Sequence, residues 1–300
     1  MKFQILLCVL AFSVTACAQT TSGTHAASQG EFAPTQVPPL PAKLEFAGEA
    51  VPLGNYDTRE SLTREMLTTL YMHSRTMQTL LASERYFAII EPILKKYGVP
   101  DDFKYLCMAE SGLNPEARSG AGAAGLWQLM PAYAKSAGLL MGGEVDERYH
   151  IEKSTEAACQ YLVDAKRRLG SWTLAAASFN AGVAGVSRRL EKQGVTSYYD
   201  LFLPSETLRY VFRVLSFKLL TGDPEAYGYR IGKEDYYKPL PEYKKVTVNS
   251  PTIDWTAFAR EHGTNYKLMR ELNPWIRDYD HNNKAGRSYV VKIPADDSRK

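Results

Sequence analysis

The feature that most constrains the fold is a helical spacing of apolar residues from about Arg59 to Leu220. Apolar side chains recur every three or four residues there, and no segment shows the alternation of a half-buried strand. Proline and glycine divide the pattern into predicted helices at 60–82, 84–97, 101–111, 126–138, 153–169, 172–180 and 205–220. The segment 172–180 is apolar on nearly every side, as is typical of a helix at the centre of an all-α domain. The sequence therefore predicts a mainly α domain over residues 59–222.

A second pattern follows a linker rich in tyrosine and proline, residues 223–244. Two strand-like segments, 245–248 and 288–294, enclose two helical stretches near 254–262 and 266–272. Residues 245–295 are therefore expected to form a small α+β module in the order strand, helix, helix, strand. No internal repeat indicates a second copy of this module.

The first residues have the pattern of an export leader. Lys2 precedes an apolar run from Phe3 to Val14, which is shorter than the roughly 20 residues that a membrane-spanning helix needs. The small residues before Cys17 resemble the lipobox of bacterial lipoproteins, in which the cysteine becomes the acylated first residue. We therefore predict a lipoprotein signal peptide over residues 1–16 and lipidation of Cys17. An ordinary secretory leader is the alternative.

Residues 17–58 are predicted to form a flexible tether behind the lipid anchor. Thr, Ser, Ala, Gly and Pro dominate the part from Ala18 to about Asn55, which shows little periodicity. Lipidation would place the protein on the periplasmic face of a membrane in the bacterial cell envelope. Ala18 stands where lipoproteins retained in the inner membrane carry aspartate, which favours the outer membrane.

Composition and spacing exclude several classes of function. The net charge is +3 over 300 residues, without the clusters of Lys and Arg expected of a nucleic-acid binder. The five histidines fall in no metal-ligand spacing, so neither a metal nor a cofactor is predicted. The nucleophile elbow of a Ser-His-Asp hydrolase is also missing. Cys107 and Cys159, the cysteines of the predicted folded part, form either a buried pair of thiols or one disulfide.

The predicted helix 101–111 places an acidic residue on its apolar face. The positions i, i+3, i+4 and i+7 of this face are Phe103, Leu106, Cys107 and Glu110. Asp102 stands at the helix start in a good N-cap context. Glu110 lies in the last turn, where the helix dipole disfavours a carboxylate, so burial and dipole both raise its pKa toward the range of a general acid. Periodicity alone supports equally a partly exposed terminal glutamate.

The segment 119–125, Ser-Gly-Ala-Gly-Ala-Ala-Gly, formally contains the G-x-G-x-x-G fingerprint of dinucleotide sites. Its context excludes that function, because the preceding residues 112–118 are polar and turn-like rather than a buried strand. Small residues instead let another chain approach the backbone closely. An extended glycan strand would suit such a wall.

Several motifs together resemble the soluble lytic transglycosylase family. They are Glu-Ser-Gly-Leu-Asn-Pro at 110–115, the segment 119–131 ending in Leu-Trp-Gln-Leu-Met-Pro, Ser-Phe-Asn-Ala-Gly at 178–182 and Glu-Thr-Leu-Arg-Tyr-Val at 206–211. In order and spacing they cover about residues 84–220. The C-terminal module resembles a divergent LysM glycan-binding module, in which Ser-Pro-Thr-Ile at 250–253 replaces the usual Gly-Asp-Thr-Leu. With the lipobox, the whole resembles the membrane-bound murein transglycosylase D type.

The resemblance implies a lysozyme-like α-helical fold that cleaves peptidoglycan glycan strands between N-acetylmuramic acid and N-acetylglucosamine without water. Glu110 would act first as the acid and then as the base, and the muramic product would carry a 1,6-anhydro ring. The alternatives are a lysozyme-type muramidase on the same fold and a non-catalytic wall-binding scaffold. The implied partners are peptidoglycan and, through Cys17, a membrane, with no nucleic acid.

Residue by residue, the resemblance also gives substrate-binding roles in the cleft. Four positions match residues of the sugar subsites, and three border the catalytic glutamate: Ser119, Gly125, Gln128 and Met130, then Phe179, Asn180 and Tyr210. Simpler alternatives exist, since Met130 and Tyr210 are equally compatible with core positions and Ser119 with a turn.

Two positions depart from the family pattern. Phe179 stands where tyrosine is usual, which removes a hydroxyl that could hydrogen-bond Glu110. Leu208 and Arg209 stand where Arg and a variable residue are usual, so Arg209 receives no role. Glu206, the other acid in these motifs, is expected to be structural because it lies at a helix start.

Overall fold

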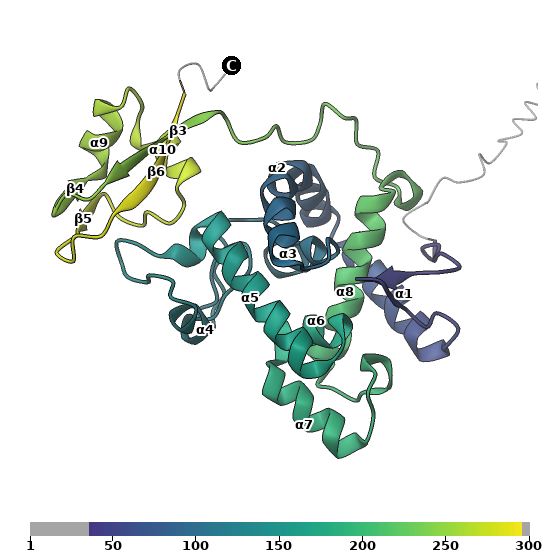
Figure 1. The fold of residues 1–300 in the computed structure, drawn as a ribbon. Coiled ribbons are helices and arrows are strands. Elements are labelled where there is room, and N and C mark those ends of the chain that lie inside the picture. Colours follow the sequence, from purple (N-terminus) through teal and green to yellow (C-terminus); the bar gives the residue numbers. More distant parts are fainter. Residues whose placement is uncertain (1–35, 296–300) are drawn as a thin grey trace, which may run out of the picture.

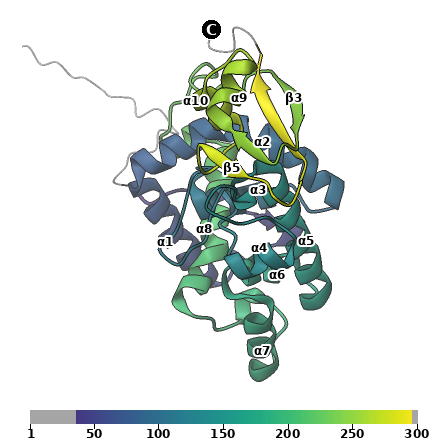
Figure 2. The same cartoon turned by 90° about the vertical axis from the view of Figure 1, so that its left-hand side faces the viewer.

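The computed structural model describes residues 36–295. Cys17, the predicted signal peptide and the first part of the predicted tether lie outside the described residues. Within 36–295 the chain forms ten α-helices, three short 3-10 helices and three two-stranded antiparallel sheets. The prediction of a mainly α protein with a small α+β C-terminal module is confirmed. This module lies at one end of the molecule and helix α7 at the other (Figures 1 and 2).

The helical domain contains eight α-helices: α1 (Tyr56–Tyr71), α2 (His73–Tyr97), α3 (Phe103–Ser111), α4 (Pro131–Ser136), α5 (Ile151–Leu169), α6 (Trp172–Ala181), α7 (Val183–Gln193) and α8 (Ser205–Gly222). Helices α3, α5, α6 and α8 begin and end within two residues of the predicted bounds. The first long break falls at Met72 rather than near residue 83, α4 is shorter than predicted, and α7 was not predicted.

Helix α6 lies at the centre of the domain, as its composition predicted. Its residues 173–178 are all buried, and it packs against α5, α7 and α8. Helix α3 packs against α2 and α8, with Phe103 and Leu106 fully buried. These contacts hold the C-terminal end of α3 next to α8.

The prediction of a free tether up to residue 58 is wrong for its described part. Strands β1 (Glu45–Phe46) and β2 (Glu49–Ala50) form a small hairpin that packs against the helical domain. The Phe46 ring is fully buried and contacts Phe103 edge-on, with 5.2 Å between ring centroids. Local periodicity cannot reveal this packing, because it depends on a few apolar residues that meet distant parts of the chain.

Polar contacts fasten the same hairpin. The Glu49 carboxylate accepts hydrogen bonds from the Ser171 hydroxyl (2.6 Å) and from the backbone N–H groups of Trp172 (2.6 Å) and Thr173 (2.9 Å), so it caps the start of α6. Asp102 was expected to cap α3, but its carboxylate accepts instead from the Ala47 N–H (2.6 Å). The N-terminal segment is therefore part of the folded domain.

The C-terminal module has the predicted order of elements. Strand β3 (Tyr243–Val248) pairs antiparallel with β6 (Tyr289–Pro294), and α9 (Trp255–Glu261) and α10 (Tyr266–Leu272) lie between them in sequence. A second strand pair, β4 (Thr252–Asp254) with β5 (Asp280–Asn282), was not predicted. The module has its own buried cluster, which includes Val145 from the loop between α4 and α5.

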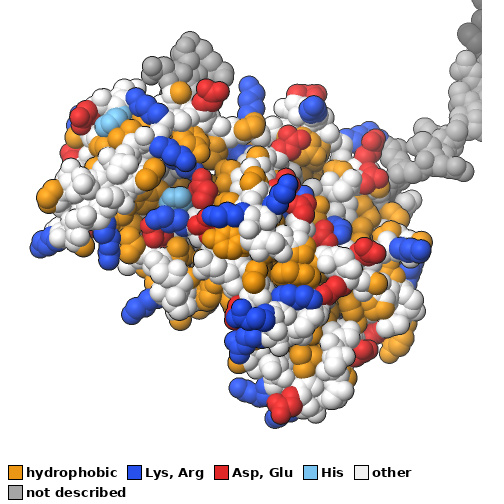
Figure 3. Space-filling view, viewed as in Figure 1, with side chains coloured by type: hydrophobic (Ala, Val, Ile, Leu, Met, Phe, Trp, Pro, Cys, Tyr) orange, Lys and Arg blue, Asp and Glu red, His pale blue; other side chains and the backbone are white. Residues whose placement is uncertain are grey.

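Three properties of the described residues complete the fold. Cys107 and Cys159 are buried free thiols, which decides between the two alternatives left open by the sequence. No helix within 36–295 is long and apolar enough to cross a membrane. Basic and acidic side chains are interspersed over the face shown in Figure 3, in keeping with the small net charge of +3.

Candidate active site

Glu110 lies in the last turn of α3, where its side chain is half-buried. The helix ends at Ser111, and Gly112 caps it in the left-handed conformation, with φ 63° and its N–H donated to the Met108 carbonyl at 2.9 Å. Glu110 thus lies on the same face of α3 as the buried Phe103, Leu106 and Cys107, at the edge of the core. This is the placement that the helical spacing predicted.

Burial raises the pKa of Glu110 to about 7. The hydrogen bond from Tyr210 and the positive charge of Arg213 oppose this effect, while the negative charge of Glu206 adds to it. A pKa near neutrality makes both the protonated and the ionised form accessible, which suits a group that gives up a proton and then takes one.

Tyr210 is buried on α8, and its hydroxyl donates a hydrogen bond to Oε1 of Glu110. Burial raises the pKa of Tyr210 well above its usual range, so the phenol stays protonated and remains a donor. The structure therefore brings these two predicted site residues into direct contact.

Glu65 and Arg213 were missed by the sequence reasoning. The Glu65 side chain, on α1, is fully buried and is contacted by Arg209 Nε at 2.5 Å and Arg213 Nε at 3.7 Å. Arg213 lies on α8, so Glu65 pairs across the α1–α8 contact with the arginine whose charge opposes the rise in the pKa of Glu110. A signal was present, because Glu65 lies on the same helical face as Leu62 and Met66.

The loop 119–130 is closed by its own polar contacts. Ser119 Oγ accepts from the Ala123 N–H at 3.0 Å, and the Ala123 carbonyl accepts from the Ser119 N–H at 2.9 Å. The side-chain amide of Gln128, a residue with φ 47°, donates to the carbonyls of Ala117 (3.1 Å) and Gly125 (2.8 Å). Ser119 thus makes the turn contacts of its simpler alternative, and its sugar-binding role stays a prediction.

Gly125 allows a close backbone approach that no other residue permits. It adopts φ 78°, and a Cβ atom there would lie 2.0 Å from the carbonyl oxygen of Arg148. The glycine is therefore needed both for its conformation and for the space that the Arg148 backbone occupies.

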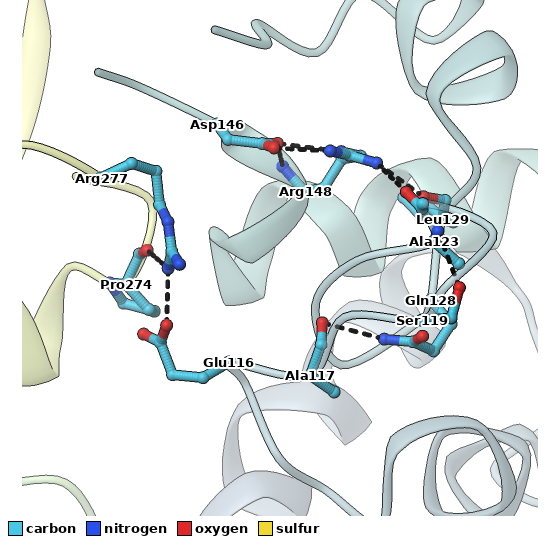
Figure 4. A network of polar contacts seen from close by, with 11 residues as sticks. Glu116, Ala117, Ser119, Ala123, Gln128, Leu129, Asp146, Arg148, Pro274 and Arg277 are labelled. Carbon is cyan, nitrogen blue, oxygen red and sulfur yellow. Dashed lines mark hydrogen bonds and ion pairs between the residues drawn. The ribbon is translucent and has the colours of Figure 1, made fainter. Parts of the chain in front are cut away.

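Arg148 supports the loop from behind and was not predicted from the sequence. Its buried guanidinium binds both carboxylate oxygens of Asp146, at 3.0 and 2.7 Å, and donates to the Gly122 carbonyl at 2.6 Å (Figure 4). The pairing with Asp146 is local, but the contact that gives Arg148 its role has no local sequence signal, because Gly122 lies 26 residues away.

The loop contacts both α3 and α6. Cys107 Sγ donates to the Leu126 carbonyl at 3.3 Å, one turn of helix before Glu110. The Phe179 ring lies edge-on to Trp127, with 6.2 Å between centroids, and is half-buried. Met130 is 47% exposed, which excludes the alternative that it is a core residue.

Asn180 connects α6 to the start of α8. Its Oδ1 accepts a hydrogen bond from the Thr207 hydroxyl at 2.8 Å. Glu206, next to Thr207, lies exposed in the first turn of α8. The last turn of α3, the end of α6, the start of α8 and the loop 119–130 thus form one connected arrangement. Within 36–295 no cluster of His, Cys, Asp or Glu could hold a metal ion.

Two parts of the chain match known domain families. Residues 87–202 match the transglycosylase SLT domain. Residues 244–297 match the soluble lytic transglycosylase C-terminal LysM-like domain.

Relatives that match most of the chain are also named as lytic transglycosylases. The membrane-bound lytic murein transglycosylase D of Escherichia coli K12 is 27% identical over 278 residues, which is 86% of this chain and 60% of that protein. The protein of the same name from Escherichia coli O6:H1 gives the same values, 27% over 278 residues. The chain thus spans 60% of the length of these curated relatives.

Among solved structures, an inactive mutant of the lytic transglycosylase Slt from Pseudomonas aeruginosa is similar, with 22% identity and a TM-score of 0.37, covering 51% of this chain and 26% of that one. The two domain matches confirm the resemblance seen in the motifs. In chain order, a helical region that matches the transglycosylase SLT domain is followed by a region that matches the LysM-like domain of soluble lytic transglycosylases.

Proposed function

We propose that this protein is a peptidoglycan lytic transglycosylase, in which Glu110 is the only catalytic carboxylate. The observation that supports this most is the position of Glu110 at the end of α3, where burial raises its pKa to about 7 and Tyr210 binds its carboxylate. The relatives named above are murein transglycosylases, and the SLT domain contains Glu110.

In the proposed reaction Glu110 transfers protons twice. The protonated acid donates its proton to the glycosidic oxygen between N-acetylmuramic acid and N-acetylglucosamine, and the C1–O bond breaks. The muramic N-acetyl group stabilises the resulting positive charge. The Glu110 carboxylate then removes the proton of the C6 hydroxyl, and O6 bonds to C1. Glu110 is again protonated, and no water is consumed.

The proposed glycan-binding wall is the loop 119–130 with the neighbouring end of α6. Ser119, Gly125, Gln128 and Met130 would contact sugars, and Phe179, Asn180 and Tyr210 would border the reacting bond. The exposed Met130 side chain offers an apolar surface to a sugar ring. Because Phe179 lacks a hydroxyl, Tyr210 is the tyrosine proposed to tune Glu110.

We also propose that the protein is a lipoprotein acylated at Cys17, held at the periplasmic face of the outer membrane. The small residues before Cys17 and the alanine after it support this, and the relatives are named as membrane-bound. A Cys17→Ala variant should leave the membrane fraction, and unchanged membrane association would contradict the proposal.

The decisive experiment is the product mass after digestion of purified sacculi. The wild type should release muropeptides with anhydro ends, lighter by one water than hydrolysis products. Glu110→Gln should release none, whereas Glu206→Gln should keep the same products, because Glu206 is exposed and outside the proposed chemistry. Reducing ends would instead identify a muramidase. A wild type inactive on every wall preparation would identify a scaffold.

A further inference from the structure

The C-terminal module binds Glu116, which lies in the segment between Glu110 and the loop 119–130. Arg270 donates to both carboxylate oxygens of Glu116, at 2.6 and 3.2 Å. Arg277 donates to Oε2 of the same carboxylate at 2.6 Å, as Figure 4 shows. Burial alone would raise the pKa of Glu116, but the hydrogen bonds from the two arginines outweigh it and the pKa is lowered. Glu116 is therefore ionised at neutral pH, and the clamp is a set of charge-assisted bonds.

A second set of contacts, which we call the seam, joins the module to the loop between α4 and α5. The Asp146 N–H donates to the Trp275 carbonyl at 2.9 Å, and the Arg277 N–H donates to the Glu144 carbonyl at 2.8 Å. Between these bonds Val145 is buried in the core of the module and pairs with Ile276. The Arg277 guanidinium also lies over the ring of Tyr149, 3.9 Å from its centroid.

The seam holds Asp146, and Asp146 binds the arginine that supports the loop 119–130. Asp146 gives its N–H to the module and its carboxylate to Arg148. Arg148 in turn donates to the Gly122 carbonyl, and its own carbonyl lies against Gly125. A continuous path of short contacts thus runs from the module through two buried charged residues to the loop.

We propose that the C-terminal module positions the loop 119–130, with Arg148 as the positioning residue between them. The loop contains isolated β-bridges but no regular element, so contacts from outside contribute strongly to its conformation. Undocking the module would break the ion pairs of the exposed Glu116, and it would also leave the Asp146 N–H without its partner and expose Val145 and Ile276 to water, which makes an undocked state costly. The inference rests on the proposed function, since it concerns the glycan-binding wall assigned there.

Amide hydrogen exchange in the full chain tests the positioning without any need for activity. Two variants break the clamp from opposite sides: Glu116→Ala, and the pair Arg270→Ala with Arg277→Ala. Both should make the amides of Ala123, Gly125 and Leu129 exchange about tenfold faster while the core of α5 and α8 is unchanged. The matched control removes two exposed cations of the module, Arg260→Ala with Lys267→Ala, and should change nothing.

Kinetics on solubilised glycan strands provide the second readout. Both clamp variants should raise KM by about three- to tenfold with kcat within about twofold, and the pH profile should keep its midpoint because Glu110 and Tyr210 lie outside the network. Arg148→Lys, which keeps one charged donor, should retain more activity than Arg148→Met.

Two outcomes would overturn the proposal. Unchanged loop exchange in both clamp variants would show that the module does not hold the loop. A raised KM confined to the arginine variant, without faster exchange, would assign Arg270 and Arg277 to direct glycan binding. If the wild type cleaves no wall preparation, the proposed function fails, but the exchange experiment still decides whether the module positions the loop.

Discussion

The Tyr210 hydroxyl donates to Oε1 of Glu110 and so connects the start of α8 to the last turn of α3. This bond stabilises the ionised carboxylate, whereas burial destabilises it. The balance of the two leaves the pKa of Glu110 near 7 rather than higher. Tyr210 therefore limits how basic the glutamate becomes.

Replacing Tyr210 by Phe should move the alkaline limb of the pH–activity profile upward. Without the hydrogen bond to its ionised form, Glu110 keeps its proton to a pH that is higher by about 0.5 to 1. The measurement is sacculus solubilisation from pH 5 to 10. Tyr133→Phe, which removes a hydroxyl bonded to the Ala157 carbonyl, is the control and should leave the limb in place. A downward shift for Tyr210→Phe would refute the assignment.

Glu110→Gln should make the protein more stable at alkaline pH. The usual pKa of a glutamate is 4.5 and burial raises that of Glu110 to about 7, so between these values the folded state binds more protons than the unfolded state. The free energy of unfolding of the wild type therefore falls as pH rises from 4.5 to 7. The free energy of unfolding of Glu110→Gln does not fall in this way, so above pH 7 it should exceed that of the wild type by about 2 to 3 kcal/mol.

Urea unfolding at pH 5 and pH 8.5 measures this effect. The exposed Glu191 on α7 provides the control, since Glu191→Gln should show the wild-type pH dependence. Equal stability of wild type and Glu110→Gln at both pH values would mean that the carboxylate is not penalised by burial.

Gly125→Ala should damage both stability and activity. The residue adopts φ 78°, and the new methyl group would overlap the Arg148 carbonyl. We expect a loss of at least about 2 kcal/mol in the free energy of unfolding and of at least about tenfold in wall cleavage. Gly120→Ala in the same loop meets no atom within 4 Å and should be nearly neutral. Chemical denaturation and sacculus assays on both variants make the comparison.

Glu49→Gln should destabilise the protein by about 1 to 3 kcal/mol at neutral pH. Burial would raise the pKa of Glu49, but hydrogen bonds from Ser171, Thr173 and Trp172 outweigh it and lower the pKa to about 2. Its stabilising contribution is therefore present above pH 4.5 and is lost as pH falls toward 2. The difference from wild type should shrink between pH 5 and pH 3. Glu45→Gln, an exposed position in the same hairpin, should behave as wild type throughout.

The sequence predicted the parts of the fold that depend on local pattern. Helices α3, α5, α6 and α8 and the strand-helix-helix-strand order of the module have clear periodicity or clear boundaries. The strands β4 and β5 contain three residues each, which is too short for a periodic pattern, and they are recognised as strands only because they pair with each other. Helix α7 was not predicted, because Gly182 by itself indicates only the end of the preceding helix. In the structure this glycine, with φ 74°, is both the C-cap of α6 and the N-cap of α7.

The site was predictable to a similar degree. Glu110 stood out because an acid occupied an apolar helical face, and the motif resemblance then supplied Tyr210. The remaining contacts were hidden for one physical reason, which is that both partners are distant in sequence. Arg148 has partners on the loop, Glu49 caps a helix more than a hundred residues away, and Arg213 is fixed through Glu65.

The seam at Val145 also has a consequence for modularity. By sequence, residues 139–150 belong to the helical domain, but Val145 completes the core of the C-terminal module and the backbone around it bonds to residues 275–277. The structural unit formed by the C-terminal module is therefore discontinuous in sequence, because it includes residues 139–150 as well as the module itself. A chimaera that transfers the module to another transglycosylase domain has to carry residues 139–150 with it, or it leaves the buried Trp275 and Ile276 open to water.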